Sequence, residues 1–261
     1  MSRGAGRPPQ TVDLRSRDLA VESDGLRLAA EAFLPESPKG VVVLLHGIPS
    51  VEPPDPEDEG YPGLARRFAE RGWAALWADM RGARAAPGFF SIEGWVHDVT
   101  AIVDAVGKLD EVAGLPLVLV GSSAGGAVSV EAVARGAHVH AVVLLGTPAA
   151  WVTFAADPMA GARRITEEAG MPLSPETLAD PTSWAAEFDR VTTERSIGVL
   201  RVPSLIVHGT ADDVVPIEHA YRLSERAPKA ELVVLQGAPH YLRRHPGVFE
   251  LVVDWLERTF R

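Results

Sequence analysis

A short glycine-bounded motif around Ser123 has the residue types of a nucleophilic turn. The motif reads Gly121-Ser122-Ser123-Ala124-Gly125, a G-x-S-x-G pattern between an apolar run and a helix-forming stretch. Glycines two residues on either side of a serine let neighbouring elements approach the turn closely. A sharp turn from strand to helix strains the serine backbone and projects its hydroxyl toward the amino end of the following helix. These residue types favour Ser123 as a nucleophile.

The candidates for base and acid lie downstream of this motif. A serine hydroxyl is a poor nucleophile until a histidine takes its proton, and a carboxylate orients that histidine. Asp212 lies in HGTADDVVP after one apolar run, and His240 lies in QGAPHYL after the next. We expect Ser123 to be the nucleophile, His240 the base and Asp212 the acid. The bare G-x-S-x-G pattern is weak in a glycine-rich chain, and a purely structural turn is the alternative.

Strands and helices alternate along the chain and predict how these residues are positioned. Residues 18–34 predict a two-stranded hairpin with a turn at Ser23-Asp24-Gly25. Six apolar runs at 40–47, 73–79, 115–121, 140–146, 203–209 and 231–237 predict buried strands. Amphipathic stretches at 63–71, 93–109, 124–135, 217–226 and 246–260 predict helices, with Pro246 in a first turn. The pattern predicts an α/β fold with a mostly parallel eight-stranded sheet and helices on both faces.

Two segments interrupt this alternation, and such connections commonly hold binding sites. Residues 49–60 form a proline-rich acidic loop, and residues 149–199 are too long for a plain crossover. We interpret residues 149–199 as a small helical cap over the strand ends. The predicted organisation is a disordered tail at 1–17, a catalytic core at 18–148 and 200–261, and the cap between the two parts of the core.

Composition excludes several classes of protein and site. The net charge of −10 argues against a nucleic-acid partner, and no polybasic patch indicates membrane binding. The absence of cysteine excludes disulfides, thiolate zinc sites and a cysteine nucleophile. No apolar run is long enough for a membrane span or a signal peptide. We expect a soluble cytoplasmic protein that acts on a small molecule, while the oligomeric state stays open.

The order of the motifs resembles that of the α/β-hydrolase superfamily. HGIP at 46–49, DMRG at 79–82, GSSAG, HGTADDVVP and GAPH follow that order, and the resemblance covers about residues 18–260. It implies an α/β-hydrolase fold and a member similar to serine esterases and lipases or to serine aminopeptidases. The backbone N–H groups of Ile48 and Ala124 would then form the oxyanion hole. The resemblance also implies that Asp212, rather than Asp213, is the acid, and it implies no cofactor.

The candidate substrate pocket depends on less specific residues. The chain reads DMRGARAAPG where many members of the superfamily have D-x-R-G-x-G, so we expect a reshaped pocket near Phe89 and Phe90. Trp151, Phe154 and Trp184 of the cap either line this pocket or hold the cap together. Serine in place of aspartate at the nucleophile position argues against haloalkane dehalogenase or epoxide hydrolase chemistry.

The remaining histidines and the acidic loop have simpler interpretations. His138 and His140 lack further ligands at metal spacing, so we expect no metal site. His46 and His208 precede glycines at strand ends, where a histidine commonly bonds to the backbone. The acidic residues at 52, 55 and 57–59 form either a solvated face or an attractor for cationic substrates.

Three functions remain open on the sequence alone. The first is hydrolysis of carboxylic esters through an acyl-enzyme intermediate. The second is the same chemistry on amide, thioester or lactone substrates. The third is a ligand-binding protein that retains the fold and the triad residues without turnover.

Overall fold

Within residues 13–50 and 57–261, which the computed structural model describes, the chain forms one eight-stranded sheet. The strand order is β1-β2-β4-β3-β5-β6-β7-β8. Strands β1 and β2 pair antiparallel, β2 is antiparallel to β4, and the other pairs are parallel. The strands are β1 (Leu14–Ser23), β2 (Leu26–Pro35), β3 (Val41–Leu45), β4 (Ala74–Ala78), β5 (Leu117–Ser122), β6 (Ala141–Leu145), β7 (Ser204–Gly209) and β8 (Ala230–Leu235). The predicted fold class is confirmed.

The hairpin at the sheet edge begins earlier than predicted. Strand β1 starts at Leu14, which pairs with Pro35, so residues 14–17 belong to the sheet and not to a tail. The side chains at 15–17 are polar and exposed, which hid this part of the edge strand from the hydrophobic pattern. The turn residues Asp24 and Gly25 have φ of 47° and 79°, as a two-residue hairpin turn requires. Residues 1–12 of the predicted tail lie outside the described residues.

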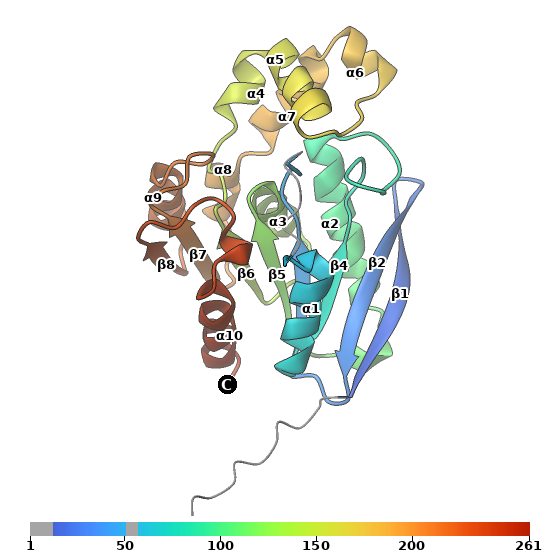
Figure 1. The fold of residues 1–261 in the computed structure, drawn as a ribbon, viewed down its shortest axis with the longest axis vertical. Coiled ribbons are helices and arrows are strands. Elements are labelled where there is room, and N and C mark those ends of the chain that lie inside the picture. The colour runs from blue at the N-terminus through green and yellow to red at the C-terminus, as the bar shows by residue number, and fades with distance from the viewer. Residues whose placement is uncertain (1–12, 51–56) are drawn as a thin grey trace, which may run out of the picture.

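Helices cover both faces of the sheet (Figure 1). Helices α1 (Gly60–Glu70) and α10 (Val248–Thr259) pack on one face. Helices α2 (Ile92–Val106), α3 (Ala124–Ala134) and α9 (Glu218–Arg226) pack on the other. Helix α10 begins after Gly247, so Pro246 precedes the helix instead of forming its first turn. No helix in the described part of the chain is long and apolar enough to cross a membrane.

A group of short helices between β6 and β7 lies over one end of the sheet (Figure 1). These are α4 (Val152–Ala156), α5 (Pro158–Arg163), the π-helix η2 (Arg164–Glu168), α6 (Pro175–Ala179), α7 (Thr182–Arg190) and α8 (Thr193–Ile197). Stacking of Phe154 on Phe188, with ring centroids 4.5 Å apart, joins α4 to α7. Helix α8 instead packs against α3 and α9. Helices α4 to α7, together with η2, therefore form the cap.

Candidate active site

Ser123 lies at the sharp turn between β5 and α3, with φ of 51° and ψ of −121°. This backbone conformation is strained for a residue other than glycine, and such strain commonly marks functional sites. The Ser123 N–H donates a 2.8 Å hydrogen bond to the Leu145 carbonyl, which holds the turn against β6. A Cβ at Gly121 would lie 2.5 Å from Gly126 Cα, and one at Gly125 would lie 2.4 Å from the His46 carbonyl. Both glycines of the motif are therefore required by close packing.

Asp212 and His240 meet although 28 residues separate them. Asp212 follows β7 and His240 follows β8, so adjacent parallel strands bring them together. His240 Nδ1 donates to Asp212 Oδ2 over 2.7 Å, and both side chains are buried. The Val214 and Val215 N–H groups donate to Asp212 Oδ1 over 3.0 and 2.7 Å. Asp213 is exposed, and this geometry orients the imidazole of His240 through Asp212.

His208 is a second histidine on the same carboxylate, and the sequence did not reveal this contact. Its Nε2 donates to the Val215 carbonyl over 2.7 Å and lies 3.3 Å from Asp212 Oδ2. Burial alone would raise the pKa of Asp212, but hydrogen bonds from His208, His240 and the Val215 N–H together bring it well below its usual range. Asp212 is therefore ionised whenever the protein is folded near neutral pH.

His46 bonds to the backbone, as we expected from its place before a glycine. Its Nε2 accepts a 3.0 Å hydrogen bond from the Met80 N–H, and its Nδ1 donates to the Gly47 carbonyl over 2.8 Å. Burial, together with the charge of Arg84, lowers the pKa of His46 to about 3. A neutral His46 thus ties the loop after β3 to the end of β4.

The loop after β3 lies directly beside Ser123. A Cβ at Gly47 would lie 2.9 Å from Ser123 Cβ and 3.5 Å from its Oγ. Ile48 is the next residue and lines the same cavity as Ser123. Ala124 is fully buried at the start of α3, on the other side of the nucleophile turn. The two segments expected to provide oxyanion donors therefore flank the serine.

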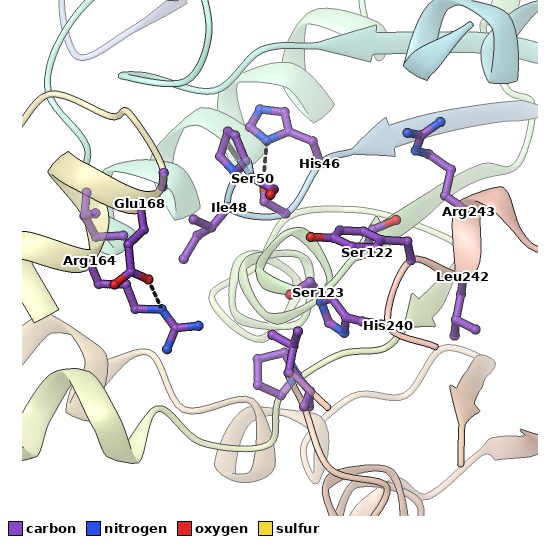
Figure 2. A pocket seen from close by; sticks show the side chains of 18 of the residues that line it. His46, Ile48, Ser50, Ser122, Ser123, Arg164, Glu168, His240, Leu242 and Arg243 are labelled. Carbon is purple, nitrogen blue, oxygen red and sulfur yellow. Dashed lines mark hydrogen bonds and ion pairs between the residues drawn. The ribbon is translucent and has the colours of Figure 1, made fainter. Parts of the chain in front are cut away.

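Ser123 and His240 open into one cavity of about 840 Å³ between the strand ends and the cap (Figure 2). Its apolar wall includes Ile48, Trp151, Phe154, Ile165 and Leu242. Polar and charged side chains, among them Asp58, Arg164 and Arg243, make up the rest of the wall, and a cavity with both kinds of lining can bind and orient a small molecule. Within the described ranges, no three side chains gather in a way that could hold a metal ion.

Three of the five aromatic residues expected in the pocket do not line this cavity. Trp151 and Phe154 do line it, whereas Phe89, Phe90 and Trp184 do not. Phe89 is 49% exposed, on the loop before α2. Phe90 and Trp184 are buried against each other and against the rings of the cap, with centroids 6.2 Å apart. Phe90 therefore packs the cap against the core, and Trp184 fits the alternative given for it, that it holds the cap together.

The acidic loop is tied to the segment that carries His240, another contact the sequence did not indicate. Both carboxylate oxygens of Asp58 accept hydrogen bonds from Arg243 at 2.5 Å, and Arg244 donates to Oδ2 over 2.7 Å. The hydrogen bond from Arg243, with further support from Arg244 and the Gly60 N–H, holds the pKa of Asp58 well below its usual range. Asp58 therefore does not act as a free attractor for cations. Glu52 and Asp55 lie outside the described residues.

Comparisons with known proteins agree with this fold. The model of the serine aminopeptidase S33 family matches residues 36–193, which include Ser123 but not Asp212 or His240. The chain therefore belongs to this family and to the α/β-hydrolase superfamily. It is 27% identical over 200 residues to the uncharacterized protein YfhR of Escherichia coli K12, an alignment that covers 74% of this chain. The chain spans 63% of the length of that relative.

Solved structures of several hydrolases share the fold. Est1E of Butyrivibrio proteoclasticus with bound ferulic acid superposes with a TM-score of 0.70 at 24% identity, over 92% of this chain and 98% of that one. The Pyrococcus furiosus esterase Pf2001 superposes with a TM-score of 0.68 at 18% identity, over 100% of this chain and 97% of that one. The acylaminoacyl peptidase of Pyrococcus horikoshii superposes with a TM-score of 0.72 at 15% identity, over 96% of this chain and 42% of that one. At these identities the likeness concerns the fold alone.

Proposed function

We propose that this protein is a serine hydrolase that cleaves carboxylic esters through an acyl-enzyme intermediate. The observation that carries the proposal is the strained turn at Ser123 in one cavity with His240, whose ring is held by the buried Asp212. A serine, a histidine and a carboxylate in this relation form the minimal set for nucleophilic acyl transfer.

Each residue has a defined part in the proposed reaction. Ser123 Oγ attacks the ester carbonyl while His240 takes its proton, and Asp212 stabilises the positive charge on the imidazole. The N–H groups of Ile48 and Ala124 hold the oxyanion of the tetrahedral intermediate. His240 then returns the proton to the leaving alcohol, and water releases the acid by the same steps in reverse. No step requires a cofactor.

The charges of the cavity favour esters over peptides with a free amino terminus. An aminopeptidase needs a carboxylate that can bind the ammonium group of its substrate. The described lining contains two carboxylates, and both pair with arginine: Asp58 with Arg243 and Arg244, and Glu168 with Arg164. Amide, thioester and lactone substrates with a neutral end remain compatible with the same residues and form the second candidate function.

A fluorophosphonate probe tests the proposal directly, because it reacts with an activated serine. We expect stoichiometric labelling of the protein and none of Ser123→Ala. Hydrolysis of p-nitrophenyl esters should exceed that of p-nitroanilides and acyl-CoA by at least about tenfold. A folded protein that neither labels nor hydrolyses any of these substrates would be a binding protein, and the proposal would fail.

A further inference from the structure

The wall of the cavity carries a charge opposite to that of the whole chain. The chain has 35 acidic and 25 basic residues. Among the described residues that line the cavity, four are arginines and two are carboxylates: Arg84, Arg164, Arg243 and Arg244 against Asp58 and Glu168. Positive groups gathered in a cleft of an acidic protein create a local potential that attracts anions.

Three of these arginines donate hydrogen bonds to carboxylates. Arg84 donates to Asp79 over 2.5 Å. Arg243 and Arg244 both bind Asp58, as described above. Their guanidinium groups therefore have structural partners that a substrate would have to displace.

Arg164 differs from the other three arginines. Its Nε forms a longer ion pair with Glu168 Oε2, at 3.7 Å and without a hydrogen bond, and its guanidinium lies 5.9 Å from the ring centroid of Phe154. Among the described residues, its two terminal nitrogens have no hydrogen-bond partner. Figure 2 shows the side chain reaching from the cap toward Ser123. A planar guanidinium with two open donors is suited to bidentate binding of a carboxylate.

The π-helix η2 contributes one of its faces to the wall of the cavity. The Ala169 N–H donates to the Arg164 carbonyl five residues before it, over 3.1 Å. A π-turn is wider than an α-turn, so residues four and five positions apart share one face. Arg164, Ile165, Glu168 and Ala169 all line the cavity. Short π-helical segments are frequent at functional sites, and here the segment presents Arg164 to the catalytic side of the cap.

We propose that Arg164 binds a carboxylate of the substrate, so that the preferred substrates are esters with a second, anionic end. This inference rests on the function proposed above and names its substrate class. Water still supplies the hydroxyl of the released acid and the proton of the released alcohol, and the anionic end is unchanged by the reaction. The carboxylate belongs to whichever half of the ester lies under the cap.

Paired substrates test this inference. On the acyl side, p-nitrophenyl valerate is compared with the p-nitrophenyl monoester of glutaric acid. On the alcohol side, phenyl acetate is compared with carboxyphenyl acetate. In one of the two series, we expect Arg164→Gln to reduce kcat/KM for the carboxylated member roughly tenfold to hundredfold, mainly through KM. The neutral members should change less than about twofold, and Arg164→Lys should retain part of the preference because it keeps the charge.

Two further variants separate recognition from fold. Arg163→Gln is the matched control, because Arg163 is exposed like its neighbour Arg164 but does not line the cavity, and it should change neither substrate class. Glu168→Gln removes the carboxylate that faces the guanidinium and should lower KM for the carboxylated substrate. Added salt should weaken the preference of the wild-type protein and have little effect on Arg164→Gln.

The outcomes distinguish this inference from the function on which it rests. Labelling by the fluorophosphonate with no carboxylate preference in either series would overturn the role of Arg164 alone. Equal losses on neutral and carboxylated esters in Arg164→Gln would also overturn it, because they would indicate a structural role. Absence of labelling and of neutral ester hydrolysis would instead remove the proposed function.

Discussion

Two adjacent aspartates allow a sharp test at the scale of single residues. Asp212 is buried and bonded to two histidines and two backbone N–H groups, whereas Asp213 is exposed. We expect Asp212→Asn to lower kcat by about 10⁴-fold, because the neutral amide neither fixes the tautomer of His240 nor stabilises its charge. Asp213→Asn should stay within about twofold. Steady-state kinetics on a p-nitrophenyl ester measures both, and equal losses would contradict the assignment of the acid.

The ends of three strands meet at the Asp212–His240 pair, which gives a test at the scale of elements. Gly146, just after β6, has φ of 58°, and a Cβ there would lie 3.3 Å from both Asp212 Oδ2 and His240 Nδ1. We expect Gly146→Ala to push this pair out of line and lower kcat by about tenfold or more. A retained kcat would show that β6 does not constrain the pair.

Gly114 is the matched control for this substitution. It has φ of 76°, and a Cβ there would meet nothing within 4 Å. Ala at either position costs about 1 kcal/mol of backbone strain. Gly114→Ala should therefore lose a similar amount of stability in urea denaturation while it retains full activity. A loss of activity in Gly146→Ala alone is then explained by the crowding of Asp212 and His240.

At the scale of the whole molecule, buried His46 predicts how stability depends on pH. Burial, with the charge of Arg84, lowers the folded-state pKa of His46 to about 3, whereas the unfolded chain binds the proton near pH 6.5. The unfolded state therefore takes up this proton first as the pH falls. We expect the free energy of unfolding to decrease from about pH 6.5 downward.

Urea denaturation at several pH values between 7 and 4.5 measures this effect. The loss of stability should be smaller in His46→Asn, although that variant is less stable overall because it loses the bond to Met80. His138→Asn, at an exposed position, is the control and should follow the wild-type curve. Below about pH 4, Asp212 and Asp58 should add to the loss, because their lowered pKa values make the unfolded state bind protons first. Parallel curves for the wild type and His46→Asn would contradict the prediction.

The sequence by itself determined the elements, their order and the turn that carries Ser123. Buried parallel strands are continuous apolar runs, and helices repeat their apolar residues at helical spacing, so both can be recognised locally. The glycines at 121 and 125 indicated the tight turn for the same local reason. Asp212 and His240 could be proposed as partners because each directly follows one of these runs, and adjacent parallel strands end at the same edge.

Only the tertiary structure decided which side chains surround that edge. Asp58 and Arg243 are 185 residues apart, and no local pattern indicates their pairing. The aromatic residues of the cap look alike in the sequence, yet Trp151 and Phe154 line the cavity while Trp184 packs inside the cap. Which side of a short helix faces a cavity depends on how it packs against distant elements. The position of Arg164 in the wall of the cavity is decided in the same way.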